Sequence, residues 1–251
     1  MSTHEELVAK GSSTARNGFR NEDDIVEKFN SWQDDEEAKR WLETMGYKLK
    51  EIEKVEAVKV TGNYKPDIQV KIKIYLKDVI SPENISIKLV SNPQGFNQID
   101  KRWVDKYVEL WNIPEELAII LKKYTGEIAP SRSDLKDSRR MFFDEMDSDA
   151  QNKIIQFFNQ NKILVISDIV KGRGIMTADW MLVVLKTNEE VKWILRNINE
   201  VMNIFGAGNV QITEKGNLKI GKVSMQRKGG DGGRETAQML QFKVNPVILF
   251  E

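Results

Sequence analysis

The chain has 251 residues, with 38 Lys and Arg against 38 Asp and Glu, and 40% of its residues are hydrophobic. This apolar content excludes a disordered chain, and no apolar run approaches the roughly 20 residues that span a bilayer. The sequence has no Cys and a single His, His4, so disulfides and Cys nucleophiles are excluded, and a His-based triad or zinc site is not expected. Any catalysis must rely on carboxylates and lysines, with or without a metal ion. The polar start of the chain shows no signal peptide, and we expect a cytoplasmic protein.

Basic residues gather near the C-terminus although the total charge is zero. Residues 1–60 hold 10 basic and 14 acidic side chains, whereas residues 215–234 hold six bases and one acid. A neutral protein with such a stretch can bind a polyanion locally. A solvated surface loop explains the same composition equally well, so charge alone leaves both interpretations open.

The first half of the chain mixes helical and strand patterns. Apolar residues four and three apart predict a helix over 21–41, and a second helical stretch over 36–45 stops at Gly46. The run over 67–76 alternates apolar and polar residues, which predicts a strand with one buried face. The next expected elements are a turn over 78–84, a strand over 85–90, helices over 98–111, 114–123 and 149–161, and a charged loop over 131–140.

The last third of the chain is predicted to be rich in strands. A helix is expected over 191–204, and Gly-containing loops separate several of the strands. The expected strands lie at 163–166, 180–185, 210–213, 219–225 and 240–244. The six Trp residues occupy apolar positions, and we expect them in the core. Together these elements predict one compact α/β domain over 1–251.

The strands over 67–76 and 85–90 predict a hairpin with chemical groups at its open end. In an antiparallel hairpin, Asp67 at the start of the first strand lies beside Lys88 near the end of the second. Ser86 and Lys88 point to one face, while Ile87 faces the core. In nucleases a carboxylate in this position holds a divalent metal on the scissile phosphate, and a lysine positions or deprotonates the attacking water. The backbone carbonyl of Ile87 is a further candidate metal ligand.

A simpler interpretation of the hairpin is favoured by spacing alone. Asp67 would then end a Lys-Pro-Asp turn, and Lys88 would face solvent, because both features are common in proteins. Glu22, at the start of the first helix, is the candidate for a second acid at the site. An acid in the first turn of a helix is also favoured by the helix dipole, and we weigh these two interpretations about equally.

The spacing of Pro66-Asp67, 18 residues and then Ser86-Ile87-Lys88 resembles the PD-(D/E)xK nuclease signature with its middle acid replaced. More of the chain resembles small type II restriction endonucleases of the HinP type, which cut the sequence GCGC. The matching blocks lie, in order and at similar spacing, at 17–22, 88–92, 95–101, 139–142, 193–201, 226–237 and 239–243.

That resemblance implies an α/β fold with a mixed central sheet flanked by helices, and a Mg²⁺-dependent endonuclease. It implies Asp67 as the metal-binding carboxylate and Lys88 as the catalytic lysine, and Glu22 is our candidate for the missing acid and a further metal ligand. The relatives carry Gln where this chain has Ser86, so a direct role of Ser86 at the metal is an open question. The catalytic hairpin belongs to a helical part over about 12–125, and a β-rich part over about 160–251 is expected to recognise DNA.

Several polar residues are predicted to contact DNA. Phe96 is expected to wedge into a base step, and Asn97 and Gln98 to read base edges. The alternative is a helix start, with Phe96 in the core and Asn97 as its cap. The Gly-rich, basic segments at 171–174 and 226–234 are expected to approach phosphates or bases. The full set of predicted DNA contacts is Phe96, Asn97, Gln98, Lys101, Arg173, Gln226, Arg227, Lys228 and Arg234.

Two classes of function follow from the sequence. The first is a restriction endonuclease that hydrolyses double-stranded DNA at a short palindromic GC-rich site, with GCGC as the expected sequence. It would act as a monomer or weak homodimer, in a prokaryotic cytoplasm, beside a cognate methyltransferase that protects the same site. The second is a non-catalytic or repair-type DNA-binding protein in which Ser86 marks a decayed metal site.

Overall fold

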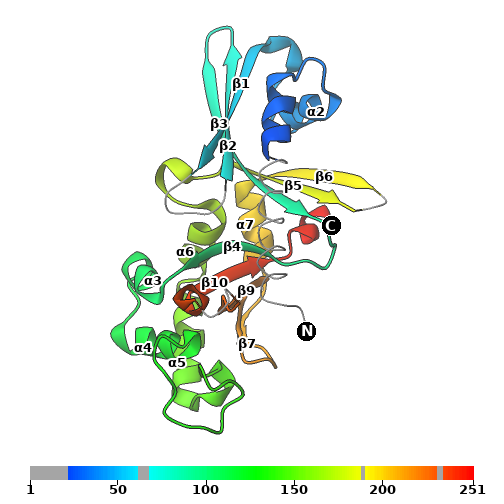
Figure 1. Cartoon of the computed structure of the whole chain (residues 1–251). Coiled ribbons are helices and arrows are strands. Elements are labelled where there is room, and N and C mark those ends of the chain that lie inside the picture. Colours follow the sequence, from blue (N-terminus) through cyan, green and yellow to red (C-terminus); the bar gives the residue numbers. More distant parts are fainter. Residues whose placement is uncertain (1–21, 62–67, 188–189, 231–233) are drawn as a thin grey trace. The chain divides into compact units, whose positions relative to one another are not determined.

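The computed structural model describes residues 22–61, 68–187, 190–230 and 234–251 (Figure 1). The chain divides into two compact units. The first unit contains Met1–Gly95, Lys171–Val201 and Asn245–Glu251, and the second contains Phe96–Val170 and Met202–Val244. Each unit therefore draws on separate parts of the sequence, and the prediction of one domain over 1–251, with parts over about 12–125 and 160–251, stays a prediction.

The first unit is built on a five-stranded sheet in the order β1-β2-β3-β5-β6. Only the pairing of β3 with β5 is parallel, so the sheet is mixed. The strands are β1 (Ile52–Thr61), β2 (Ile68–Leu76), β3 (Ile80–Val90), β5 (Trp180–Lys186) and β6 (Val191–Asn197). The helical elements are a helix over 22–30, α2 (Glu36–Thr44), and 3₁₀-helices at Leu49–Glu51, Gly174–Met176 and Pro246–Phe250.

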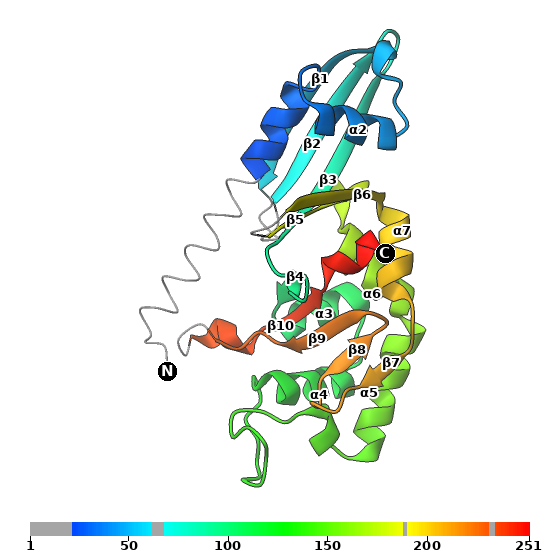
Figure 2. The same ribbon diagram turned by 90° about the vertical axis from the view of Figure 1, so that its right-hand side faces the viewer.

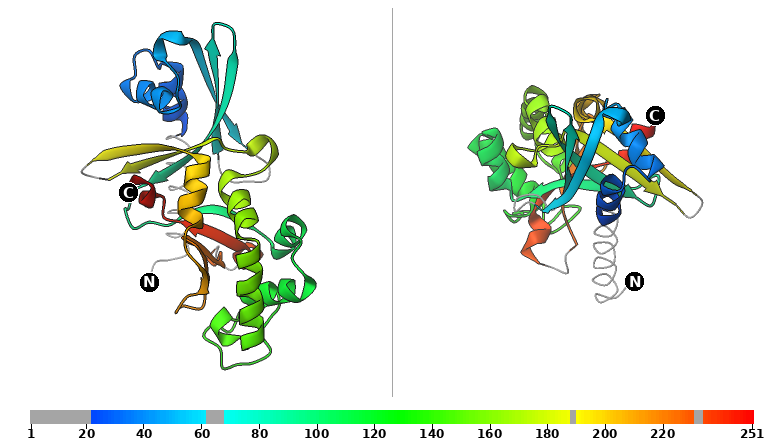
Figure 3. Two further views of the ribbon diagram at one scale, coloured as in Figure 1. Left: turned by 180° about the vertical axis from the view of Figure 1, so that it is seen from behind. Right: turned by 90° about the horizontal axis from the view of Figure 1, so that it is seen from above.

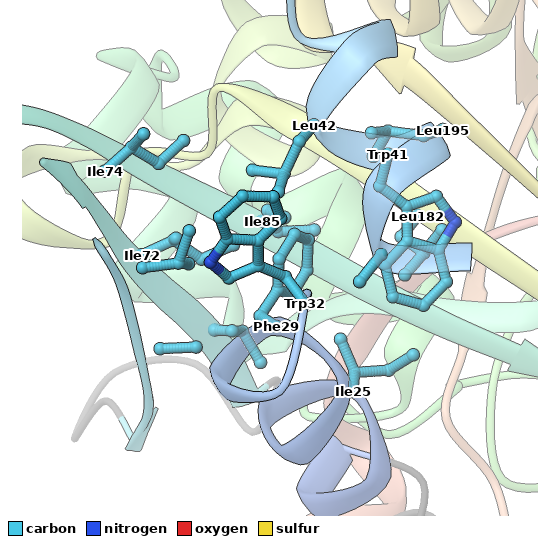
Figure 4. Close-up of a cluster of buried hydrophobic side chains, with 14 of the residues drawn as sticks. Ile25, Phe29, Trp32, Trp41, Leu42, Ile72, Ile74, Ile85, Leu182 and Leu195 are labelled. Atoms are coloured by element: carbon cyan, nitrogen blue, oxygen red, sulfur yellow. The ribbon is translucent and has the colours of Figure 1, made fainter. Parts of the chain in front are cut away.

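One face of this sheet carries the core of the first unit (Figure 4). The alternation in β2 buries Val70, Ile72 and Ile74 on that face, as the sequence predicts. The helix over 22–30 and α2 cover the face with Phe29 and Trp41, whose rings pack 5.2 Å apart. This packing positions the first turn of the helix, and with it Glu22, beside the sheet.

The second unit contains an antiparallel sheet in the order β4-β10-β9-β8-β7, whose strands lie side by side in Figure 2. Its strands are β4 (Asn97–Arg102), β7 (Val210–Ile212), β8 (Leu218–Ile220), β9 (Val223–Arg227) and β10 (Leu240–Val244). Its helices are α3 (Val104–Trp111), α4 (Glu115–Thr125), α5 (Ser148–Gln160) and α6 (Lys162–Ile166), with short helices at Phe143–Glu145 and Glu235–Gln238 and a π-helix at Ser167–Lys171. Helix α7 (Ile198–Gly206), visible in Figure 3, begins in the first unit and ends in the second.

Aromatic side chains form the core of the second unit. Tyr107 and Trp111 of α3 stack with their centroids 4.6 Å apart. Phe242 of β10 packs edge-on against both rings, and Phe158 of α5 packs against Trp111. The core face of β10 is therefore covered by helices, and the alternate residues of the strand lie on the opposite face.

The predicted α/β class with a mixed sheet flanked by helices is confirmed, although the strands form two sheets. Two predicted helices were too long at their N-terminal ends. Residues from Gln98 to Arg102 belong to β4, which pairs with β10, and residues 191–197 form β6, which pairs with β5. The spacing of apolar residues only weakly favours a helix in both segments, and hydrogen bonds to the neighbouring strand stabilise the extended conformation instead.

Two further predictions of local structure were wrong. Residues 163–166 lie in α6 and do not form a strand, because a short apolar run is ambiguous between the two structures. The turn expected over 78–84 is mostly strand, since β3 begins at Ile80. Pro82 is tolerated there because β5 pairs with β3 only from Ile85 onward, so this part of β3 is an edge strand.

Of the six Trp residues, Trp32, Trp41 and Trp111 are buried, while Trp103, Trp180 and Trp193 are half-buried. Within the described residues, no helix has the length and apolar character needed to cross a membrane.

Candidate active site and nucleic-acid-binding residues

The end of β3 carries Ser86 and Lys88 on one face and Ile87 on the other. Ile87 joins the hydrophobic cluster of the first unit, as predicted. Ser86 and Lys88 are only 6% and 5% exposed, so both polar groups are buried on the central strand of the sheet. The simpler interpretation, in which Lys88 faces solvent, is therefore wrong. A buried lysine is a costly feature that is typical of functional sites.

Asp67 lies outside the described residues, so its predicted position beside Lys88 stays a prediction. The described part of the β2–β3 ladder begins two residues later, where Gln69 pairs with Ser86. The antiparallel pairing continues through Val70 with Ile85 and beyond. The hairpin predicted from the alternating pattern is confirmed.

Gln69 is a site residue that the sequence analysis missed. Its side chain is buried beside Ser86, and its Nε2 donates a hydrogen bond to the carbonyl of Met176 at 2.6 Å. This bond fixes the orientation of the amide, because only the nitrogen can donate to a carbonyl. The other amide atom, Oε1, is buried and has no hydrogen-bond partner within the described residues. The sequence held a signal for this position, because Gln69 is two residues after Asp67 in the alternating strand. Residues two apart share a face, and in the predicted hairpin this is the face of Ser86 and Lys88.

Glu22 is brought close to Lys88 by the packing of its helix. Its Oε2 lies 3.5 Å from Nζ of Lys59 on β1, and Asp23 accepts a hydrogen bond from the same Nζ at 3.0 Å. Burial raises the pKa of Glu22, and the positive charges of Lys59 and Lys88 oppose this rise. Glu22 therefore lies within electrostatic range of Lys88, although 66 residues separate them. Lys59 is a second residue that the sequence analysis missed, because nothing in the alternation of β1 distinguishes it.

The polar groups gathered here are oxygen donors with lysines beside them. The carboxylate of Glu22, the hydroxyl of Ser86 and the unsatisfied Oε1 of Gln69 are hard ligands of the kind that Mg²⁺ and Ca²⁺ prefer. Within the described ranges, no three Asp, Glu, His or Cys side chains gather as a metal-binding group. The chemistry of these oxygen ligands fits a hard divalent cation.

In the second unit, Phe96 is 55% exposed, so its alternative assignment to the core is wrong. Asn97, Gln98 and Lys101 lie on β4 and do not form a helix start. Lys101 pairs with Gln241 of β10, which pairs in turn with Gln226 of β9. These three side chains therefore form a row across the sheet.

A second row runs beside the first, because Gln98 pairs with Lys243 and Lys243 pairs with Ser224. The two rows thus place amides, lysines and a hydroxyl on one face of the second sheet. Asp100, the carboxylate of β4, pairs with Phe242 on the core face and forms an ion pair with Arg102 at 3.2 Å. These two rows contain amides and bases and no acid, a composition that is suited to contacts with base edges and phosphates.

The Gly-rich segment after β9 lies close to this face. Burial lowers the pKa of Lys228, and so do the charges of Lys101 and Arg234, which places all three bases near one another. Gly229 and Gly230 both adopt positive φ, at 65° and 64°, which lets the backbone turn without strain.

Arg173, in the first unit, is exposed and precedes the 3₁₀-helix whose Met176 binds Gln69. Within the first unit, this predicted DNA contact therefore lies in the segment that accepts the hydrogen bond of Gln69.

A mixed sheet with a buried lysine near one strand end and an acid of the covering helix within electrostatic range, together with a sheet faced by amides and bases, is typical of a nuclease-like α/β protein. The fold is similar to that of restriction endonuclease MspI, solved in complex with its cognate DNA. The TM-score is 0.67, with 14% sequence identity over 96% of this chain and 93% of MspI. The family model of the R.HinP1I restriction endonuclease matches residues 45–250. The chain belongs to this family and is a type II restriction endonuclease. No protein with a curated description matches the chain.

Proposed function

We propose that the enzyme hydrolyses double-stranded DNA at the palindromic sequence GCGC in a Mg²⁺-dependent reaction. The observation that supports this most is the buried Lys88, with Ser86 and Gln69 beside it on the sheet and Glu22 within electrostatic range. A duplex DNA substrate is also supported by the fold shared with MspI, which was solved with its cognate DNA.

We assign Asp67 as the principal metal-binding carboxylate by the register of the hairpin. Gln69 pairs with Ser86, so a ladder continued by two residues would set position 67 opposite Lys88. Glu22 and the backbone carbonyl of Ile87 are the further proposed ligands. This arrangement corresponds to a PD-(D/E)xK site in which Ser86 replaces the middle acid, and Gln69 offers an amide oxygen beside that serine.

The proposed reaction is an in-line displacement at phosphorus. A bound divalent cation would polarise the phosphodiester and lower the pKa of a nearby water. Lys88 orients that water or accepts its proton, and its charge offsets the negative charge that develops on the phosphate oxygens. The water oxygen bonds to phosphorus as the bond to O3′ breaks, and O3′ takes up a proton from solvent water, which leaves a 5′-phosphate and a 3′-hydroxyl.

Binding of the duplex is assigned to residues of both units. Phe96 is exposed and free of the core, as a wedge between bases must be. The amides of Asn97, Gln98 and Gln226 are proposed to read base edges, whereas lysines and arginines contact phosphates or guanines. The proposed bases are Lys101, Arg173, Arg227, Lys228 and Arg234.

Digestion of plasmid DNA in the presence of Mg²⁺ tests the proposed function. Wild-type protein is expected to produce discrete fragments that map to GCGC, and Asp67→Ala is expected to abolish them. Asp78→Ala is the control, because Asp78 is an exposed acid at the turn between β2 and β3. Binding of DNA without cleavage under any divalent metal would instead support a non-catalytic DNA-binding protein.

The role of Gln69 and Ser86 at the metal gives a second prediction. Gln69→Leu removes the amide at nearly constant volume and is expected to weaken Mg²⁺ affinity by about 10- to 100-fold. Ca²⁺ titration of the protein–DNA complex by calorimetry measures this without relying on cleavage. Ser86→Gln in the Gln69→Leu background is expected to restore part of the affinity, because it returns an amide oxygen to the same face. Unchanged Ca²⁺ affinity in Gln69→Leu would exclude the proposed role of Gln69.

The biological setting follows from the proposed activity. A host that produces this nuclease must protect its own sites, so we propose a cognate methyltransferase for the same sequence in a prokaryotic cytoplasm. We further propose a monomer or weak homodimer, which would cut one strand in each binding event unless two chains cooperate. Sedimentation of the protein with and without a GCGC duplex distinguishes these two states.

A further inference from the structure

Three arginines of the second unit meet near the end of β9. Arg139 and Arg140 end the charged loop after α4, and Arg227 is the last residue of β9. Burial lowers the pKa of Arg227, and the nearby charges of Arg139 and Arg140 lower it further. Like charges at partial burial repel one another, so such a cluster needs a compensating negative charge.

Within the described residues, Asp137 is the carboxylate that forms ion pairs with this cluster, and Arg139 already occupies it. Asp137 accepts hydrogen bonds from Nε and Nη2 of Arg139 at 2.8 and 3.0 Å, and this pairing holds its pKa at about 2. Nε of Arg140 lies 3.6 Å from the same carboxylate, beyond hydrogen-bond distance. Asp137 therefore places a single negative charge among three guanidinium groups, and its hydrogen bonds go to Arg139.

Arg140 and Arg227 carry buried donors that lack acceptors. Nε and Nη1 of Arg140 and Nε of Arg227 are buried without a hydrogen-bond partner in the part of the chain that the structure describes. An unsatisfied donor on a charged group carries a desolvation cost larger than that of a neutral group. An anion with several oxygen atoms would accept hydrogen bonds from these donors. It would also offset the positive charge of the two guanidinium groups.

The guanidinium of Arg140 is held in place by aromatic rings. It lies 3.9 Å from the ring centroid of Phe142 and 5.4 Å from that of Tyr124. Tyr124 is itself fixed, because its hydroxyl donates to Asn217 at 2.6 Å and its ring stacks on Phe143. The stacking fixes the plane of the guanidinium, and an arginine held in this way is suited to bind an oxyanion through its N–H groups.

Gly126 contacts both the backbone of Arg139 and the segment that follows the Gly-rich loop. It ends α4 with a φ of 86°, and the carbonyl oxygen of Arg139 lies 2.4 Å from where a Cβ would stand. No other residue fits so close an approach without movement of the loop. The carbonyl of Gly126 accepts a hydrogen bond from Gln238 at 3.0 Å, which ties the segment after the Gly-rich loop to the same point.

We propose that Arg140 and Arg227, with Arg139 beside them, form a binding site for a phosphate group of the DNA backbone. The site goes beyond the DNA contacts proposed above, since it adds Arg139 and Arg140 and assigns Arg227 to a phosphate in place of a guanine. It rests on the proposed function in so far as the phosphate belongs to substrate DNA. The chemistry would also accept free phosphate or sulfate.

The test measures DNA binding against salt with Arg140→Gln and Arg227→Gln. Fluorescence anisotropy is recorded in Ca²⁺ for a GCGC duplex and for a duplex of the same composition without the site. Each variant is expected to lose affinity on the order of tenfold for both duplexes alike. The slope of log affinity against log salt should become shallower by about 0.9 for each phosphate contact that is lost.

Four comparisons make this test specific. Arg132→Gln is the matched control, because Arg132 lies in the same loop but is exposed and paired with Asp134 at 2.8 Å, and it should behave as wild type. Arg140→Lys keeps the charge without the fork and should keep most of the salt slope. Thermal melting identifies any variant that fails to fold, and Arg227→Gln then serves in place of Arg140→Gln. Inorganic sulfate at constant ionic strength should raise the melting temperature of wild type more than that of Arg140→Gln.

The outcomes separate this inference from the proposed function. An unchanged salt slope in both folded glutamine variants would overturn the phosphate site, and so would a loss confined to the GCGC duplex. If wild type fails to cut DNA but the variants lose affinity and slope for both duplexes, the phosphate site stands and the proposed function fails. If wild type cuts at GCGC and the variants bind as wild type does, only the phosphate site fails.

Discussion

Replacement of Lys88 by Met is expected to slow DNA cleavage by about 10²- to 10⁴-fold while duplex binding in Ca²⁺ is largely retained. Lys88 is 5% exposed, and the change keeps its length while removing the charge. The loss should fall on the rate of the cleavage step, because the lysine acts on the water and on the charge that develops at phosphorus. Single-turnover kinetics with saturating enzyme measures this rate directly.

Lys73→Met is the matched control for Lys88→Met. Lys73 belongs to β2 and lies on the same face of the sheet, but it is exposed and pairs with Pro82 near the far end of the hairpin. Its replacement should leave the cleavage rate within about twofold of wild type. Equal rates for Lys88→Met and wild type would show that Lys88 has no catalytic role.

Replacement of Trp41 by Ala is expected to lower the free energy of unfolding by about 3–5 kcal/mol. Trp41 is 1% exposed and packs against both Phe29 and Trp193, with ring centroids 5.2 and 5.6 Å apart. Its removal leaves a cavity beneath the helix over 22–30, which carries Glu22. Urea denaturation followed by circular dichroism measures the change, and activity should fall with the folded fraction.

Two further variants, Trp41→Phe and Val58→Ala, are expected to lose less stability than Trp41→Ala. Trp41→Phe keeps an aromatic ring and removes the indole Nε1, which is buried without a partner within the described residues, so its cost should be well below that of Ala. Val58 is an exposed residue of β1, and its replacement by Ala should cost about 0.5 kcal/mol or less. A loss in Trp41→Ala as small as that in Val58→Ala would contradict the assigned packing.

The local pattern of the hairpin was predictable because it depends on neighbouring residues. Strict alternation over 68–76 and 85–90 determined which side chains share a face, and the structure has Ile87 in the core and Ser86 and Lys88 on the other face. The capping Asp35 and the stop at Gly46 likewise set the ends of α2 close to their predicted positions.

The segments that were predicted as helix but form strands pair with other segments of the chain. Residues 97–102 form a strand because β10 pairs with them, and no sequence pattern within β4 indicates this pairing. Residues 191–197 form a strand through β5, although their apolar spacing also suits a helix. Hydrogen bonds to these partner strands therefore determine the strand conformation of both.

The sequence by itself determined the α/β class and the hairpin of β2 and β3, because composition and alternation are local properties. Its zero net charge also proved compatible with a basic face, since acids such as Asp100 pair on the core side of the sheet. Only the tertiary structure decided that Glu22 lies near Lys88, that Gln69 sits beside Ser86, and that Arg139 and Arg140 meet Arg227. Those positions follow from packing and cross-strand pairing between segments far apart in the chain, which no local pattern encodes.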